Sequence, residues 1–142
     1  MIVLDASVIL KWFIVEIDSE KATDFKNQYS KNELDIIIPD LLLYEVANAL
    51  RYKESVDINE INLILTSLFA LQLKVVSPSL NLFQKAIPIS QDFEVSLYDS
   101  TYLALAIELD CYLITAGEKF YKKIILKDKN SKIKLLKNII IK

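Results

Sequence analysis

The chain has 142 residues, of which 53% are hydrophobic and 25% charged, so its composition is typical of a globular protein and not of a disordered segment. Its formal net charge of −2 gives no overall attraction to nucleic acid, so nucleic-acid binding would need a local basic patch. It has no histidine and one glycine, which excludes histidine-dependent hydrolysis, most zinc sites and glycine-rich phosphate loops. Any chemistry must therefore rely on carboxylates, hydroxyls, lysines or a bound ion.

We expect one domain over residues 1–142, because a chain of this length can bury roughly 70% of its unfolded surface around one core. The only cysteine, Cys111, cannot form an intrachain disulfide. The N-terminus lacks the pattern of a signal peptide, and no apolar run approaches the roughly 20 residues of a membrane span. We therefore expect a soluble, cytoplasmic protein without a membrane partner.

Short apolar runs alternate with helical patterns along the chain. In chain order, the sequence predicts a strand at 2–4, helices at 6–13 and 19–29, a strand at 35–40, helices at 41–54 and 57–73, a strand at 74–78, helices at 79–90 and 96–110, a strand at 111–116, a helix at 118–126 and a short strand at 133–138. We expect Ser19 and Asp57 to cap their helices, Pro88 to disturb its helix, and the helix at 96–110 to be amphipathic. The alternation predicts an α/β protein whose parallel sheet is covered on both faces.

Three acidic residues interrupt apolar neighbourhoods: Asp5 follows the first strand, Glu45 lies early in the helix at 41–54, and Asp99 lies early in the helix at 96–110. The carboxyl ends of parallel strands share one sheet edge, where helices could bring all three acids together. Clustered carboxylates raise one another's pKa unless a divalent cation neutralises them, and oxygen-only ligands favour Mg²⁺ or Mn²⁺. For each acid the alternative is helix capping or a favourable contact with a helix N-terminus.

Four stretches, "MIVLDASVILKWF", "YEVANAL", "YDSTYLALA" and "LITAGEKFYKK", resemble the four motif regions of the PIN domain, in order. More narrowly, the chain resembles the VapC-like ribonuclease toxins of type II toxin–antitoxin pairs. The resemblance implies a three-layer α/β/α sandwich with a central parallel sheet of four to five strands. It also implies a metal-dependent endoribonuclease that holds Mg²⁺ or Mn²⁺ through Asp5, Glu45 and Asp99. The implied partners are an RNA substrate, an antitoxin protein and a second copy of the chain in a homodimer.

The resemblance adds two catalytic hydroxyls. Ser7 matches the hydroxyl residue that follows the first acid, and Thr115 matches the one at the end of the fourth strand. For both, ordinary hydrogen bonding to the local backbone is the alternative. Asn48 lies one turn after Glu45 on the same helical face, where either a structural role or a role in the site is open.

One position departs from the family pattern. The family usually carries a fourth acid two residues after the threonine, and this chain has Gly117 there. Glu118 follows, but an offset of one residue near a helix start points a side chain elsewhere. The alternative roles of Gly117 are a helix cap or a turn with positive φ. Three acids can still hold one Mg²⁺, so we expect an altered or weakened site.

The segment from Glu118 to Lys142 carries nine of the 17 basic residues, an asymmetry that the net charge hides. Lysines beside a carboxylate–metal site can hold an RNA backbone through its phosphates, and a solvated helix face is the alternative. The predicted RNA-binding residues are Lys119, Lys122, Lys123, Lys11 and Arg51. Stacking on bases is open to Tyr98 and Tyr102, although we favour core packing for both.

The helix predicted at 57–73 is apolar almost all round, so it is either buried in the core or covered by a second copy or an antitoxin helix. Two other functions stay open. A PIN-like domain without its fourth acid could bind RNA or a protein without cleaving. A phosphoacceptor domain built on Asp5, Thr115 and Lys119 would lack the usual acidic pair beside the acceptor.

Overall fold

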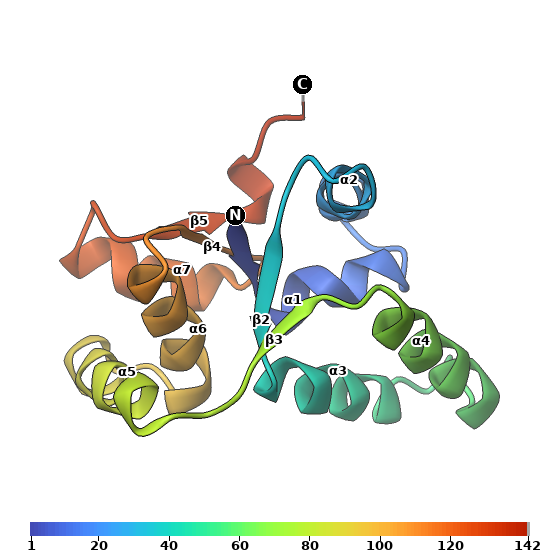
Figure 1. Cartoon of the computed structure of the whole chain (residues 1–142), viewed down its shortest axis with the longest axis horizontal. Helices are drawn as coiled ribbons and strands as arrows, with labels where there is room; N and C mark the ends of the chain where they lie inside the picture. Colours follow the sequence, from blue (N-terminus) through green and yellow to red (C-terminus); the bar gives the residue numbers. More distant parts are fainter. Residues whose placement is uncertain (142) are drawn as a thin grey trace.

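The computed structural model describes residues 1–141 and contains one sheet of five parallel strands in the order β3-β2-β1-β4-β5 (Figure 1). The strands are β1 (Ile2–Leu4), β2 (Ile36–Pro39), β3 (Lys74–Val76), β4 (Tyr112–Thr115) and β5 (Ile133–Leu135). The helices and 3₁₀ turns are α1 (Ala6–Ile9), η1 (Leu10–Trp12), α2 (Ser19–Ser30), α3 (Leu41–Arg51), α4 (Ile58–Ala70), α5 (Leu80–Phe93), α6 (Leu97–Glu108), α7 (Glu118–Lys127) and η2 (Leu136–Asn138). The predicted strand at 133–138 is therefore half strand and half 3₁₀ turn.

Helices cover both faces of the sheet, which confirms the predicted α/β/α sandwich. Helices α1 to α4 lie on one side of the sheet and α5 to α7 on the other (Figure 1). This division follows from the strand order, because right-handed crossovers that build the sheet in opposite directions from β1 place their helices on opposite faces. No helix within residues 1–141 has the length and apolar character that crossing a membrane requires.

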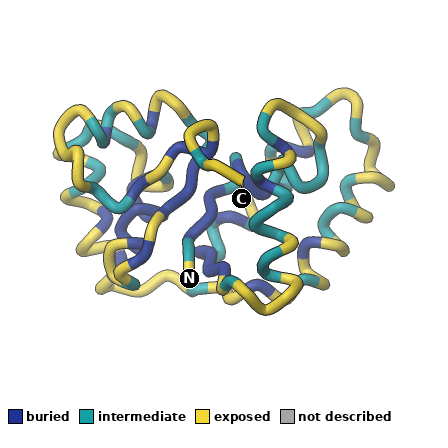
Figure 2. Tube along the Cα trace, turned by 90° about the horizontal axis from the view of Figure 1, so that it is seen from above, coloured by how far each residue is buried: buried dark blue, intermediate teal, exposed yellow. Residues whose placement is uncertain are grey.

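The core lies between the sheet and its helices, and the buried segments run through the middle of the molecule (Figure 2). Strand β2 is buried along its whole length, as a central parallel strand should be. Helix α6 packs on β1, β2 and β4 and against α5. Seven consecutive residues of this helix, 100–106, are buried. The prediction of an amphipathic helix was therefore wrong, because α6 is enclosed by the sheet and α5 and has little solvent-facing side.

Helix ends agree only in part with prediction. Asp57 caps α4 as predicted, since its carboxylate accepts the Glu60 N–H at 2.9 Å. Ser19 is not a cap: it is the first residue of α2, and its hydroxyl accepts the Glu16 N–H at 2.8 Å. Helix α5 continues through Pro88 and ends only at Phe93. Pro88 lies on the exposed side of α5, where water can satisfy the carbonyl left without a donor.

Candidate active site

The acidic residues meet at the carboxyl edge of the sheet. The strand order reverses between β1 and β4, and the crevice beyond such a switch point is where open α/β sheets bind ligands. Asp5 directly follows β1, and Thr115 is the last residue of β4. A cavity of about 430 Å³ opens here, and its lining includes Asp5, Glu45 and Asp99. The three acids thus reach one cavity from three separate parts of the chain.

Asp5 is buried and held by several donors. It is the N-cap of α1, and its Oδ1 accepts the Ser7 N–H at 3.1 Å and also the Ser7 hydroxyl. The Ser7 hydroxyl in turn accepts the Ala116 N–H at 2.9 Å, which ties α1 to the end of β4. Burial raises the pKa of Asp5 to about 6, against the lowering effect of the hydrogen bonds from Ser7 and Thr115. Asp5 therefore combines its capping role with a place in the cavity.

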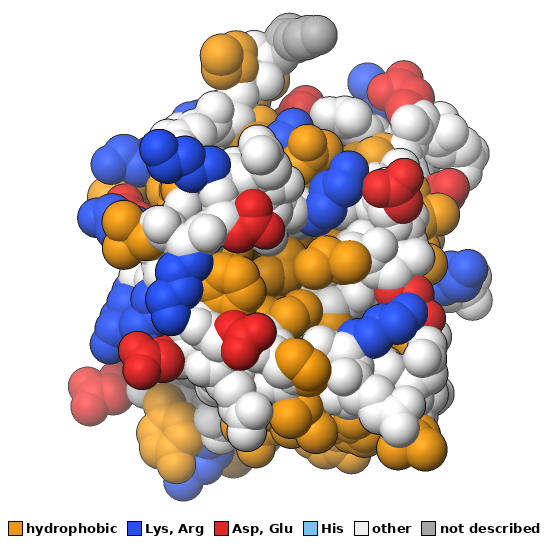
Figure 3. Space-filling view, turned by 90° about the vertical axis from the view of Figure 1, so that its left-hand side faces the viewer, with side chains coloured by type: hydrophobic (Ala, Val, Ile, Leu, Met, Phe, Trp, Pro, Cys, Tyr) orange, Lys and Arg blue, Asp and Glu red, His pale blue; other side chains and the backbone are white. Residues whose placement is uncertain are grey.

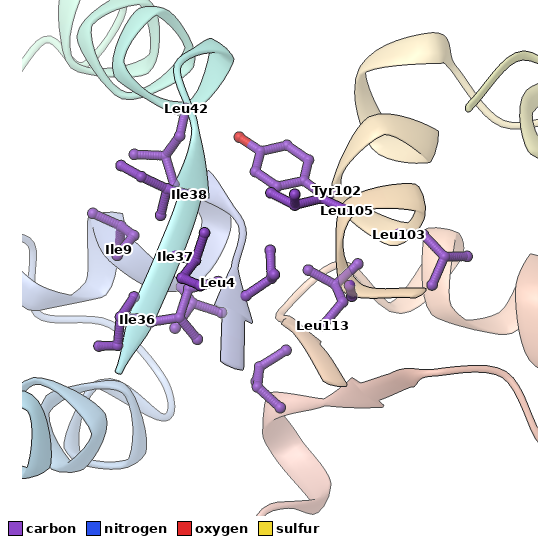
Figure 4. Close-up of a cluster of buried hydrophobic side chains, with 14 of the residues drawn as sticks. Leu4, Ile9, Ile36, Ile37, Ile38, Leu42, Tyr102, Leu103, Leu105 and Leu113 are labelled. Atoms are coloured by element: carbon purple, nitrogen blue, oxygen red, sulfur yellow. The ribbon is translucent and has the colours of Figure 1, made fainter. Parts of the chain in front are cut away.

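Glu45 is held by a residue whose role the sequence did not reveal. The Tyr102 hydroxyl donates a hydrogen bond to Glu45 Oε1 at 2.5 Å. The Tyr102 ring lies among the buried side chains and its hydroxyl points toward α3, the helix of Glu45 (Figure 4). Burial raises the pKa of Glu45, the Tyr102 bond lowers it, and the charge of Asp99 raises it. The signal for Tyr102 was its position three residues after Asp99, on the same helical face.

Asp99 lies in the first turn of α6, where its N–H donates to the hydroxyl of the N-cap Ser96 at 3.0 Å. Burial raises its pKa, and the charge of Lys123 lowers it. All three acids therefore have raised pKa values, mainly because the cavity desolvates them. A bound cation would relieve this cost.

The donors of the cavity suit a hydrated divalent cation. All three acids offer oxygen, which Mg²⁺ and Mn²⁺ prefer, and Mg²⁺ binds through one or two carboxylates plus waters and substrate phosphate. Within residues 1–141, no three acidic side chains stand close enough to enclose an ion by themselves. The cavity volume of about 430 Å³ leaves room for waters beside an ion. The residues thus fit an ion that keeps part of its water shell.

Gly117 adopts an ordinary backbone conformation. It is the N-cap of α7 with φ −77° and ψ 99°, so of the two alternative roles given for it the helix cap is confirmed and the turn with positive φ is wrong. Its N–H donates to the hydroxyl of Thr115 at 3.0 Å. A Cβ built on Gly117 would lie 3.4 Å from that hydroxyl oxygen and 3.8 Å from Phe120 Cβ, which is normal contact. Neither backbone nor space requires glycine at this position.

The side chains of α7 divide between the cavity and the solvent. Lys119 and Lys123 line the cavity. Glu118 does not: it is exposed and pairs with Lys137 at 3.5 Å and Lys122 at 3.9 Å. Glu118 therefore does not replace the missing acid, and Lys122 lies outside the cavity. On the face drawn in Figure 3, Lys and Arg side chains gather along one side, with acidic side chains beside them.

Two of the predicted RNA-binding residues lie away from the acids. Lys11 Nζ donates to the carbonyl of Ile17 at 2.8 Å and pairs with Glu16 at 3.3 Å. Arg51 stacks on the ring of Tyr52 at the end of α3. Neither lines the cavity, and the exposed Asn48 does not line it either.

Comparisons with known proteins agree with this arrangement. No curated protein matches the chain by sequence. A toxin–antitoxin complex from Klebsiella pneumoniae superposes with a TM-score of 0.70 at 14% identity, covering 98% of this chain and 100% of that one. VapC20 of Mycobacterium tuberculosis, described as a sarcin–ricin loop cleaving toxin, gives 0.65 at 13% identity, covering 86% and 94%. DNA-bound VapBC2 from Rickettsia felis gives 0.65 at 14% identity, covering 95% and 98%.

At 13–14% sequence identity, these structural similarities establish the fold. The family model described as the PIN domain matches residues 2–125, which is most of the chain and includes every residue that lines the acidic cavity. The chain therefore belongs to the PIN domain family.

Proposed function

We propose that the chain is a VapC-like toxin, an endoribonuclease that depends on Mg²⁺ or Mn²⁺ and hydrolyses RNA phosphodiester bonds. The observation that carries this proposal is that Asp5, Glu45 and Asp99, from separate elements, line one cavity at the carboxyl edge of the sheet. The acids are desolvated and have raised pKa values, a state that a divalent cation would relieve. The chain has no histidine to offer a different hydrolytic mechanism.

The residues have separate tasks in this proposal. Asp5, Glu45 and Asp99 would hold the ion partly through its own waters, since the three acids do not enclose it by themselves. The ion would supply an activated water and would stabilise charge on the scissile phosphate. Ser7 and Thr115, predicted as catalytic hydroxyls, act in this proposal as positioning residues that donate hydrogen bonds to the Asp5 carboxylate. The cavity also presents ammonium groups that can contact the RNA phosphates. Lys119 and Lys123 are the best placed of these, whereas Lys122, Lys11 and Arg51 would reach only more distant parts of an RNA.

An RNA cleavage assay with purified protein tests the activity. Wild type with Mn²⁺ should cleave a mixed RNA substrate, and EDTA should stop the cleavage. Asp5→Asn keeps the shape of the side chain but removes its charge, so it should abolish cleavage. Asp57→Asn is the matched control, because Asp57 is also an aspartate N-cap but lies outside the cavity. Equal cleavage by Asp5→Asn and wild type would refute the assignment.

Gly117 favours a second candidate function, RNA or protein binding without cleavage. The usual fourth carboxylate is missing, and Glu118 is held outside the cavity by Lys122 and Lys137. Calorimetry separates the two functions. A wild-type protein that binds RNA but neither binds Mn²⁺ nor cleaves would support the second function and contradict the first.

The surface of α4 supports an antitoxin partner. Ile58, Leu63 and Phe69 are 76%, 68% and 62% exposed, and Leu68 is the only fully buried residue of the helix. Ile61, Ile64 and Leu65 pack against the core and are partly buried, so burial in the domain accounts for part of this apolar helix and leaves Ile58, Leu63 and Phe69 uncovered. We propose that α4 docks an apolar helix of an antitoxin, and that the chain also forms a homodimer. Size-exclusion chromatography with light scattering, on the chain alone and co-expressed with the product of the adjoining upstream reading frame, tests both assemblies.

A further inference from the structure

One basic side chain is held at the wall of the acidic cavity. Lys123 is half-buried on α7, and its Nζ donates to the backbone carbonyl of Glu94 at 2.8 Å. Both Lys123 and Glu94 line the cavity that contains Asp99. Lys123 is also the basic residue whose charge acts on Asp99. The hydrogen bond to Glu94 therefore holds an ammonium group at the cavity wall, on the side of the third acid.

The cavity wall formed by α7 carries positive charge, although the family usually has its fourth acid at the start of this helix. Its N-cap residue, Gly117, carries no side chain, and Glu118 is exposed and forms ion pairs with Lys122 and Lys137. The charged groups that α7 presents to the cavity are those of Lys119 and Lys123. A second metal ion would find no carboxylate contributed by α7 and would meet the two positive charges of Lys119 and Lys123 there.

The formal charges of the lining point to a single divalent cation. The residues that line the cavity include four acids, Asp5, Glu45, Glu94 and Asp99, and two lysines, Lys119 and Lys123. The carboxylates exceed the ammonium groups by two, which one divalent cation neutralises. A two-ion arrangement would leave an excess of positive charge in a cavity that already contains lysines.

We infer that Lys123 is the second cation of this site: it contacts a non-bridging oxygen of the scissile phosphate where a two-ion nuclease would use its second metal ion. This inference rests on the proposed ribonuclease function. Lysine binds phosphate as a compact point charge, and a fixed positive charge stabilises the charge that develops on a transferring phosphoryl group. Lys123 keeps its proton throughout. A water oxygen forms the new bond to phosphorus and that water releases one proton to solvent. The bond to the leaving ribose oxygen breaks, and that oxygen takes up one proton from solvent.

The test compares Lys123→Met with Lys127→Met. Lys127 lies one turn further along α7, and its Nζ also donates to a carbonyl at the end of α5, that of Asp92, at 2.5 Å. Lys127 does not line the cavity. Comparing the two variants therefore separates the effect of a positive charge at the cavity from the effect of a lost lysine–carbonyl hydrogen bond. We expect Lys123→Met to cleave RNA at least about tenfold more slowly. We expect the same variant to bind Mn²⁺ about fivefold more tightly in calorimetry without RNA, because the ammonium no longer repels the ion beside Asp99.

Lys127→Met should change neither the rate of RNA cleavage nor the affinity for Mn²⁺. Lys123→Arg keeps the positive charge, so its cleavage rate and Mn²⁺ affinity should stay close to those of wild type. Equal behaviour of Lys123→Met and Lys127→Met would overturn the inference, and so would slower cleavage by Lys123→Met without tighter Mn²⁺ binding. A wild type that neither binds Mn²⁺ nor cleaves RNA would instead contradict the proposed ribonuclease function, and the inference with it. If wild type binds Mn²⁺ and cleaves RNA, and Lys123→Met does both equally well, the inference alone is contradicted.

Discussion

The Tyr102 hydroxyl donates a hydrogen bond to the Glu45 carboxylate at 2.5 Å, and so joins α6 to α3 inside the acidic cavity. Tyr102 is 1% exposed, so the ring is fixed by the core and its hydroxyl has little freedom to move. One oxygen of Glu45 accepts this bond, which leaves the other available to a ligand in the cavity. Tyr102 is therefore a positioning residue for the second acid.

Removing this hydroxyl should weaken metal binding without unfolding the protein. Tyr102→Phe keeps the buried ring but leaves Glu45 without its donor, and we expect Mn²⁺ affinity to fall about tenfold, the equivalent of one lost hydrogen bond to a charged group. Calorimetry measures the affinity, and circular dichroism checks the fold. Tyr98→Phe is the matched control, because Tyr98 lies on the same helix but is 61% exposed and outside the acidic cavity. An unchanged affinity in Tyr102→Phe would show that the hydroxyl does not position Glu45.

Stability in the absence of metal should fall as the pH rises. Folded Asp5 keeps its proton up to a pKa of about 6, whereas the unfolded chain releases it near 3.8. The folded state therefore binds more protons between these values, and from pH 4 to 7 Asp5 should remove about 2 kcal/mol from the free energy of unfolding. Glu45 and Asp99, whose pKa values are also raised, act in the same direction.

The variant Asp5→Asn isolates this contribution. In EDTA at pH 7.5 it should be more stable than wild type, and its stability should depend less on pH. Mn²⁺ should stabilise wild type but not Asp5→Asn, because only wild type binds the ion. The difference in free energy of unfolding between the two proteins should therefore be smaller with Mn²⁺ than with EDTA. Urea unfolding at pH 4.5 and 7.5, with EDTA and with Mn²⁺, measures these effects. A wild-type stability that does not change between the two pH values in EDTA would contradict the burial of a carboxylate at this position.

Restoring the missing acid should strengthen the site. Space and backbone both accept a side chain at Gly117, and aspartate is a favourable N-cap residue. Gly117→Asp should therefore raise stability by about 0.5 kcal/mol and tighten Mn²⁺ binding. Gly117→Asn is the control: it caps α7 equally well without a charge, so it should share the gain in stability and lack the gain in affinity. The same Mn²⁺ affinity in both variants would mean that position 117 does not face the ion.

The exposed face of α4 should matter for association and not for folding. Leu63 is 68% exposed, so Leu63→Ser should change the free energy of unfolding by less than about 0.5 kcal/mol. In a co-expressed pair, the same variant should weaken the complex with the antitoxin. Leu68→Ser gives the contrast, since Leu68 is 2% exposed and its loss should cost about 3 kcal/mol. A complex of unchanged stability with Leu63→Ser would exclude this face as the docking surface.

The sheet and the meeting of the acids could be predicted from sequence because both depend on short-range patterns. Buried β-branched runs define the parallel strands, and an acid that follows such a run must lie at the carboxyl edge. The contact between Tyr102 and Glu45 was not predicted, because it depends on how α6 and α3 pack across 57 residues of sequence. The amphipathic reading of α6 failed for a related reason: only the packing shows that α5 covers its outer side.

The basic residues show the same limit. The clustering of lysines along the sequence predicted a basic C-terminal segment, but it does not say which lysines face the acids. Lys123 does so because a backbone carbonyl at the end of α5 holds its ammonium group, whereas Lys11 is drawn to Glu16 and the Ile17 carbonyl. Such assignments depend on individual acceptors contributed by distant parts of the chain, and no local pattern encodes them.

The central claim is that the cavity of Asp5, Glu45 and Asp99 holds a divalent cation. A crystal soaked in Mn²⁺ and measured at a wavelength where manganese scatters anomalously tests it most directly. One anomalous peak within the cavity, in contact with Asp5 and Asp99 and absent from crystals of Asp5→Asn, is the predicted result. Two results would contradict the account: no anomalous peak in this cavity at saturating Mn²⁺, or a peak of equal height in crystals of Asp5→Asn.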